Sequence, residues 1–167
     1  PYTLEEVVAR NFLIQEKPDA ILNIVDGSNL ERNLYLTTQL LEMGVPVVVA
    51  VNMMDVVRKR GDEIHADQLA KELGCNVVEI SALKNEGIDE VVNCLKTIGS
   101  AAVPTPITFS AVAEEAISTI EGRLPSSVPA SLKRFYAIKL LEKDSKIAAA
   151  LEGAPDVSLS LIHISEP

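Results

Sequence analysis

The run 47–51, Val-Val-Val-Ala-Val, is the feature that most constrains the fold of this chain. A short, uninterrupted β-branched run is typical of a strand that is buried on both faces of a parallel sheet. The run stops abruptly at Asn52 and Asp55, which flank two methionines. Because ligands bind at the carboxyl edge of open α/β sheets, we expect these two polar side chains to face a ligand.

Length and charge narrow the class of protein. The chain has 167 residues and a formal net charge of −9, which argues against a nucleic-acid partner because such surfaces gather Lys and Arg. No apolar run reaches the roughly 18 residues that cross a bilayer, and we expect no signal peptide. Cys75 and Cys94 have no metal-ligand spacing, so we expect buried free thiols in a reducing compartment. The sequence by itself predicts a soluble piece.

Strand and helix patterns alternate along the first part of the chain. Apolar runs predict buried strands at about 20–25, 46–51 and 76–80, and helical spacing predicts helices at about 4–15, 29–43, 66–73 and 88–98. Val8 and Phe12 fall on the expected inward face of the first helix, Ser28 and Glu31 form a predicted capping box, and 58–62 reads as a polar loop. This order predicts an α/β fold, a parallel sheet with helices on both faces.

The composition changes after this region. Pro104 and Pro106 predict a stiff linker, and helical stripes follow, with breaks at Pro125 and Pro129 and a possible third helix at about 147–151. We therefore expect an α/β domain over 1–99, a linker over 100–108 and a small all-α segment over 109–155. Residues 156–167 lack any pattern that continues their neighbours and are expected to be a non-native tail.

Two strand ends carry the chemistry. Asn52 and Asp55 follow one predicted strand, and Ser81 and Ala82 follow the next, so both loops should open at the same sheet edge. A carboxylate can accept from the N1 and N2 hydrogens of guanine, whereas Asn52 and a backbone N–H near Ala82 can donate to its O6 and N7. Adenine presents the opposite pattern and would leave groups unpaired. The pair of loops predicts a guanine site.

Each of these residues also has a plain structural explanation. Asn-x-x-Asp occurs in many surface turns, Ser81 could be a helix or turn cap, and Met53 is more often a packing residue than a contact to a base face. Asp26 most simply caps the turn after its strand, and His65 is a lone loop histidine without partners for a metal.

Three other functions stay open at this point. A GTPase acting on tRNA or the ribosome would need a basic face. A receiver-like or flavodoxin-like module would use Asp26 and Lys84 and leave Asn52 and Asp55 without a role. A structural interaction module describes the part after Thr108 best.

Longer segments resemble a known family. Residues 23–40, beginning Asn-Ile-Val-Asp-Gly-Ser-Asn, together with 47–57 and 77–84, resemble the cytosolic G domain of ferrous iron transport protein B (FeoB). Residues 1–10 resemble the stretch after that family's Asp-x-x-Gly switch loop, and 134–142 resemble its helical domain. The likeness implies a partial P-loop-GTPase-like (Ras-like) fold that comprises the C-terminal part of the G domain and the start of the helical domain.

The resemblance also implies roles for individual residues. Asn52 and Asp55 match the guanine-specificity motif, Ser81 and Ala82 match the second base-binding loop, and Lys84 is a weaker candidate beside them. Met53 stands where GTPases commonly have a Lys that covers the base, so the affinity for the base is expected to be modest.

Cofactors and partners follow from the same likeness. It implies GTP or GDP, Mg²⁺ in the parent protein, Fe²⁺ as its transported ion, a membrane domain in the same chain, and the cytoplasmic face of the bacterial inner membrane. The sequence itself has no Gly-x-x-x-x-Gly-Lys-Ser/Thr loop and no Asp-x-x-Gly, and the Thr that binds Mg²⁺ in the family is missing as well. We therefore expect this piece to bind guanine nucleotide weakly and not to hydrolyse GTP.

Overall fold

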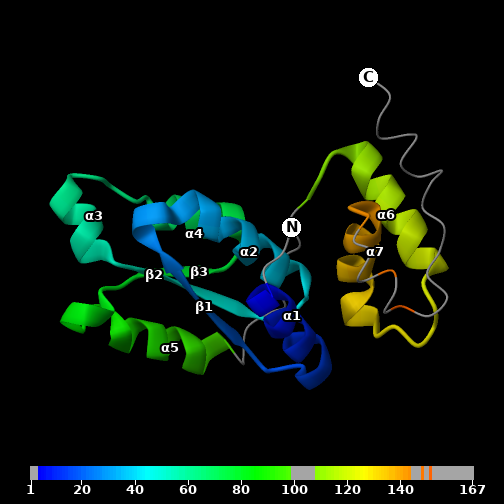
Figure 1. The fold of residues 1–167 in the computed structure, drawn as a ribbon, viewed down its shortest axis with the longest axis horizontal. Coiled ribbons are helices and arrows are strands. Elements are labelled where there is room, and N and C mark those ends of the chain that lie inside the picture. Colours follow the sequence, from blue (N-terminus) through cyan, green and yellow to red (C-terminus); the bar gives the residue numbers. More distant parts are fainter. Residues whose placement is uncertain (1–3, 99–107, 144–147, 149–150, 152–167) are drawn as a thin grey trace. The chain divides into compact units, whose positions relative to one another are not determined.

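The computed structural model describes residues 4–98, 108–143, 148 and 151 (Figure 1). The chain divides into two compact units, one comprising residues 1–41 and 45–106 and the other 42–44 and 107–167. The predicted linker and tail lie almost wholly outside the described residues, as does most of the predicted third helix.

The first unit is built on a three-stranded parallel sheet. Its strands are β1 (Ile21–Asp26), β2 (Val47–Asn52) and β3 (Asn76–Glu79), in the spatial order β1-β2-β3. The register pairs Asp26 with Asn52 and Val51 with Glu79, so the carboxyl ends of the strands lie side by side. This arrangement confirms the predicted parallel sheet.

β2 lies at the centre of the sheet, and residues 47–51 are at most 1% exposed. Val48 and Ala50 pack with Val78, Val91 and Ile98 in one apolar cluster on the face that α5 covers. Burial of one valine side chain contributes about 1.5–3 kcal/mol relative to leaving it exposed. Asn52, which follows this run, is therefore held in place by a well-packed strand.

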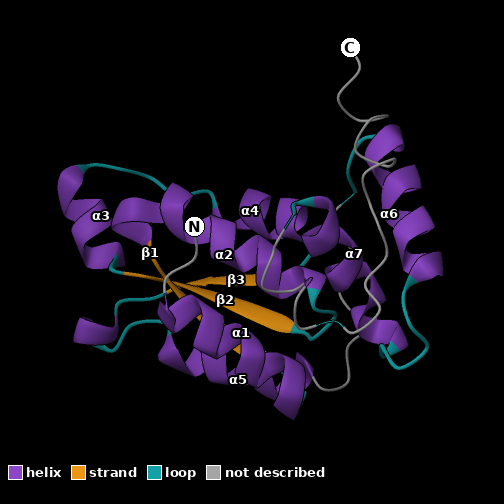
Figure 2. Cartoon of the chain, turned by 45° about the vertical axis from the view of Figure 1, so that its right-hand side comes forward, coloured by secondary structure: helices purple, strands orange, loops and turns teal. Residues whose placement is uncertain are grey.

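Five helices surround the sheet. They are α1 (Leu4–Glu16), α2 (Leu30–Glu42), α3 (Met54–Arg60), α4 (Ala66–Leu73) and α5 (Ile88–Ile98). Figures 1 and 2 show α1 and α5 on one face of the sheet and α2 and α4 on the other. Helices thus cover both faces, as predicted. Short 3₁₀ turns at Gly27–Asn29 and Ala82–Lys84 follow β1 and β3.

The structure corrects the predicted burial at the sheet edge. Leu22 and Ile24 are 40% and 59% exposed, whereas Ile21 and Val25 are buried. β1 pairs with β2 alone among the described strands, and alternate residues of a strand point to opposite faces. The prediction that β1 is buried on both faces was wrong because only one of its faces is fully covered.

Two other local predictions were also wrong. Val8 and Phe12 of α1 are exposed, not inward. Ser28 does not cap through Glu31, because its hydroxyl and its backbone N–H both donate to Asp26 Oδ1, at 2.7 and 2.8 Å. Asp26 therefore caps the 3₁₀ turn, the simple role expected for it, and these hydrogen bonds from Ser28 lower the pKa of its carboxyl group.

Cys75 and Cys94 are free thiols, and each is half-buried. Burial raises the pKa of Cys75 to about 11, which keeps this thiol protonated and unreactive near neutral pH.

The second unit contains α6 (Ala111–Arg123), a 3₁₀ turn at Ala130–Leu132 and α7 (Lys133–Leu141). Ile117 and Ile120 of α6 and Phe135 of α7 are each 1% exposed and form the centre of its core. No helix in the parts of the chain that the structure describes is long and apolar enough to cross a membrane.

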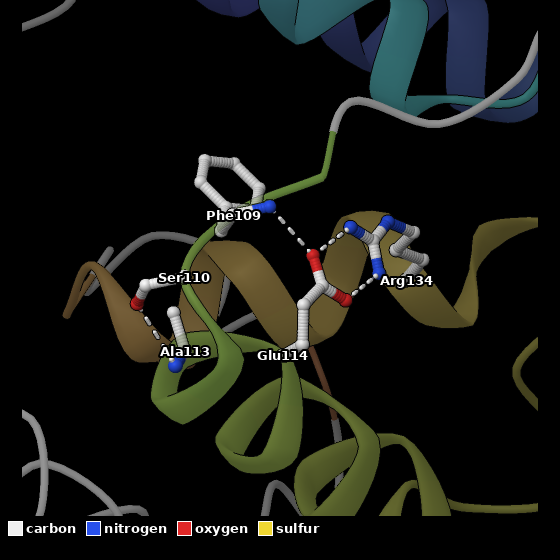
Figure 3. A network of polar contacts seen from close by, with 5 residues as sticks. All are labelled: Phe109, Ser110, Ala113, Glu114 and Arg134. Atoms are coloured by element: carbon white, nitrogen blue, oxygen red, sulfur yellow. Dashed lines mark hydrogen bonds and ion pairs between the residues drawn. The ribbon is translucent and has the colours of Figure 1, made fainter.

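A polar network holds the start of α6 (Figure 3). Arg134 donates to both carboxylate oxygens of Glu114, at 2.8 and 2.9 Å, and the Phe109 N–H donates to Glu114 Oε1 at 2.9 Å. The Ser110 hydroxyl accepts from the Ala113 N–H as the N-cap. Hydrogen bonds from Arg134 and then Phe109 lower the pKa of Glu114 to about 2.

Candidate functional site at the carboxyl ends of β2 and β3

The chain turns sharply after β2. Met53 has a left-handed backbone (φ 66°) and precedes the first turn of α3, which carries Asp55. Residues other than glycine pay a steric cost for this conformation, so the turn is held by its surroundings. One support is the Met54 N–H, which donates to the Ile80 carbonyl of the neighbouring strand end at 3.2 Å. Asp55 thereby stands at the sheet edge with a fixed backbone.

Residues 58–60, predicted to lie in a polar loop, form the last turn of α3 instead. Met54 and Val57, three residues apart, are buried beneath the helix, and Gly61 ends it in a left-handed conformation (φ 78°). An acidic first turn, a basic last turn and a following glycine are ordinary helix signals. The loop prediction rested on the polar composition of residues 58–62 instead of on these signals.

The loop after β3 closes on itself. The backbones of Ser81 and Glu86 exchange two hydrogen bonds, Ser81 N to Glu86 O at 3.1 Å and Glu86 N to Ser81 O at 3.0 Å. Ala82, Leu83 and Lys84 project between them in an exposed 3₁₀ turn, whereas Ser81 is completely buried. Residues 81–86 and the following Gly87 together form the 81–87 loop.

Side chains join the two strand ends. The Ser81 hydroxyl donates to Asp55 Oδ1 at 3.0 Å, and the Ala82 N–H donates to Asn52 Oδ1 at 3.0 Å. Four of the residues singled out in the sequence therefore come together at one edge of the sheet. Only tertiary structure could bring them within contact, because 26 and 30 residues separate the two pairs.

The two weaker candidates lie at the margin of this cluster. Met53 is 40% exposed beside Asn52. Lys84 is exposed, and its backbone N–H donates to the Ser81 carbonyl at 3.1 Å. No contact among the described residues joins the Lys84 ammonium to Asp55 or Asn52.

Two residues of this region were not singled out in the sequence. Arg58 of α3 donates to Glu86 of the 81–87 loop, with 2.8 Å between Nη1 and Oε2. Arg58 follows Asp55 by three residues, which places both on one face of a helix. In a helix over residues 54–60, this spacing predicts that Arg58 lies near Asp55.

His65 lies apart from this cluster, at the start of α4. It borders an open hollow that Glu63, Asp67 and Glu79 also line. Within the described part of the chain, no group of three or more His, Cys, Asp or Glu side chains could hold a metal ion.

Fold and strand ends together define a class of protein. A parallel α/β sheet that presents Asn-x-x-Asp and Ser-Ala on adjacent strand ends has the architecture of a nucleotide-binding G domain. Comparison with known families then identifies the particular one. The family model described as ferrous iron transport protein B matches residues 1–95, and the FeoB cytosolic helical domain matches residues 109–166. The chain belongs to the FeoB family.

Curated relatives agree with this assignment. The chain is 39% identical over 158 residues to an Fe(2+) transport protein A/Fe(2+) transporter FeoB fusion protein of Porphyromonas gingivalis, which covers 88% of this chain and 18% of the relative. It is 37% identical over 144 residues to the Fe(2+) transporter FeoB of Legionella pneumophila, with 86% and 19% covered. The chain thus spans about a fifth of the length of these relatives.

Solved structures show the same fold. The mGMPPNP-bound NFeoB of S. thermophilus superposes with a TM-score of 0.83 at 46% identity, covering 98% of this chain and 61% of that one. NFeoB of S. thermophilus bound to GDP.AlF4- and K+ superposes with a TM-score of 0.84 at 45% identity, covering 98% of this chain and 63% of that one. The predicted fold class, a partial Ras-like α/β domain followed by helices, is confirmed.

Proposed function

We propose that this chain recognises the guanine base of GTP or GDP through Asn52, Asp55, Ser81 and Ala82. The observation that carries the proposal is the position of the Asp55 carboxylate. One of its oxygens accepts from the fully buried Ser81 hydroxyl, and it stands beside the linked pair of Asn52 and Ala82. A carboxylate oriented in this way offers its remaining acceptor capacity to a planar base.

The hydrogen-bonding chemistry favours guanine over adenine. Asp55 Oδ2 has no hydrogen-bond partner among the described residues and can accept from the N1 and N2 hydrogens of guanine. Adenine has no hydrogen on N1, so it would leave this carboxylate unpaired, and a mismatch of this kind discriminates strongly. Discrimination by Asp55 is thus a property of charge and hydrogen bonding, not of pocket shape.

Ala82 and Asn52 supply the remaining contacts in this proposal. The Ala82 N–H donates to Asn52 Oδ1, so it must leave or share that acceptor before it donates to guanine O6. The Asn52 amide group can donate to N7. Met53 is exposed enough to lie against the face of the base, and Lys84 is a secondary contact at the rim.

The wider role follows from the relatives, which are named Fe(2+) transporters. We propose that residues 1–99 are the C-terminal part of a G domain, that 109–155 are part of a helical domain, and that 100–108 link them. Residues 156–167 would be a non-native tail. The whole protein would use GTP for Fe²⁺ uptake, with this part at the cytoplasmic face of the bacterial inner membrane, connected to a membrane domain. Membership of the family disfavours a receiver-like module and a tRNA- or ribosome-associated GTPase.

Mg²⁺ is proposed for the parent protein, as the family resemblance implies. No suitable group of His, Cys, Asp or Glu side chains is present among the described residues. In this proposal the chain reads the base, because its sequence has no Gly-x-x-x-x-Gly-Lys-Ser/Thr loop for the phosphates.

The test is base selectivity in a chimera. The part of S. thermophilus NFeoB that lies outside the region matched by this chain would be joined to it, because phosphate contacts supply much of the affinity for a nucleotide. We expect GDP to bind at least about a hundredfold more tightly than ADP, as in sites built around base hydrogen bonds. Asp55→Asn should shift the preference from GDP to xanthosine diphosphate. Glu79→Gln, which removes a nearby carboxylate from β3, is the matched control.

Calorimetric titration with the three diphosphates measures all of these affinities. Equal affinity for GDP and ADP would contradict the proposal, and so would an Asp55→Asn protein that keeps its preference for GDP over xanthosine diphosphate.

A further inference from the structure

Arg58 and Glu86 make a second link between α3 and the 81–87 loop. Their charged groups are 2.8 Å apart, and both side chains are more than 40% exposed. The same guanidinium lies within electrostatic reach of Glu79 and Asp55, whose negative charges add to the attraction by Glu86. Because the pair is exposed, it is open to screening by salt.

The contact reaches the base-reading groups through the backbone. Glu86 exchanges two backbone hydrogen bonds with Ser81, and Ser81 holds the Asp55 carboxylate through its hydroxyl. Ala82, which follows Ser81, carries the N–H expected to meet the base. A displacement of Glu86 would therefore move Ser81 and Ala82 relative to α3.

Two residues of α3 are thus tied to the same loop. Asp55 contacts the loop at its first residue and Arg58 contacts it at Glu86, and these two residues lie three apart on the helix. Two links at separate points restrain rotation of the loop as well as its distance from the helix. Loss of either link would remove one of the two side-chain restraints that hold the loop against α3.

We propose that Arg58 and Glu86 are positioning residues that hold the 81–87 loop against α3 and so prolong the residence of a guanine nucleotide. The inference rests on the proposed function, since it assigns to this ion pair the spacing between the Ala82 N–H and the Asp55 carboxylate. Neither residue touches the base in this arrangement. Their effect is on the affinity and dissociation rate of the nucleotide, and not on the choice between guanine and adenine.

The experiment uses the full 167-residue chain and four variants. Arg58→Gln and Glu86→Gln each break the pair, Arg58→Glu combined with Glu86→Arg reverses it, and Lys59→Gln is the control with the same loss of charge on the same helix turn. Amide hydrogen exchange of residues 81–87 reports the loop, and an NMR titration with GDP and ADP reports binding. Exchange of the β2 amides reports whether the sheet itself has changed.

We expect Arg58→Gln and Glu86→Gln to speed exchange of the loop and weaken GDP binding by about two- to fivefold, the range typical of exposed ion pairs. Exchange in β2 and the ratio of GDP to ADP affinity should not change. The reversed pair should recover most of both effects, and 1 M NaCl should bring the wild type close to Arg58→Gln. Lys59→Gln should behave as the wild type.

The outcomes separate the two proposals. A wild-type chain that binds GDP no better than ADP overturns the proposed function, whatever the loop does. A wild-type chain that prefers GDP, with an Arg58→Gln variant that matches it in loop exchange and GDP affinity, overturns the positioning role alone. Faster loop exchange without weaker GDP binding overturns it as well.

Discussion

The Ser81 hydroxyl donates to Asp55 Oδ1 at 3.0 Å across two loops that are 26 residues apart in the chain. Ser81 is completely buried, whereas the carboxylate it holds remains partly exposed at the sheet edge. A buried neutral donor thus fixes the orientation of an accessible charged acceptor. This one hydrogen bond connects the stability of the fold with the geometry of the candidate site.

Removal of that donor should affect stability and binding together. We expect Ser81→Ala to lower the free energy of unfolding by about 1–2 kcal/mol, because it removes a hydrogen bond to a charged group. GDP binding should weaken in the same variant as Asp55 gains rotational freedom. Urea denaturation and the GDP titration measure the two effects, with the exposed Thr97→Ala as control. Unchanged stability in Ser81→Ala would show that the hydrogen bond contributes nothing net.

A buried polar pair joins β1 to α2. Thr37, which is 0% exposed, donates to the side-chain carbonyl of the buried Asn23 at 2.6 Å. Thr37→Val should cost about 1–3 kcal/mol, because it leaves the Asn23 amide without this partner in the core. Thr38→Val, which removes a hydroxyl bonded only to a local carbonyl, should cost less. In the double variant Asn23→Leu/Thr37→Val, the loss should be smaller than the sum of the single losses.

Gly87 occupies a turn position that disfavours any residue with a Cβ atom. Its φ is +75°, and an added Cβ would overlap the Glu79 carbonyl oxygen. We expect Gly87→Ala to cost more than about 1 kcal/mol, since it combines a left-handed backbone with a clash against the main chain. Gly122→Ala lies in α6 with open space around the new methyl group, and it should stabilise the chain by roughly 0.5–1 kcal/mol. Thermal unfolding of both variants compares the two effects.

The ion pair of Glu114 and Arg134 should make the second unit sensitive to acid. The pKa of Glu114 is lowered from 4.5 to about 2 in the folded state, so its contribution to stability is present above about pH 4.5 and is lost as the pH falls toward 2. We expect faster hydrogen exchange of the α6 amides over that window. Glu114→Gln should remove most of this pH dependence, whereas Glu115→Gln, its exposed neighbour, should keep it. An identical pH profile in both variants would contradict the assignment to Glu114.

Much of the fold could be predicted because its signals are local. The apolar run of β2, the helical spacing of α4 and α5, and the glycines that end helices all act within a few residues, and the structure has these elements close to their expected bounds. Local polarity also misled at α3, where a charged surface resembled a loop. The exposure of Leu22 and Ile24 could not be predicted from neighbouring residues, because it depends on which elements cover that face of β1.

The sequence by itself determined the family, the strand that ends at Asn52 with Asp55 shortly after it, and the alternation that makes the sheet parallel. Tertiary structure alone decided that the Ser81 hydroxyl meets Asp55, that Asn52 engages the Ala82 N–H, and that Arg58 reaches Glu86. The physical reason is the range of the forces involved. Backbone preference and hydrophobic periodicity act between near neighbours, whereas these contacts depend on strand register and helix crossovers that bring distant parts of the chain together.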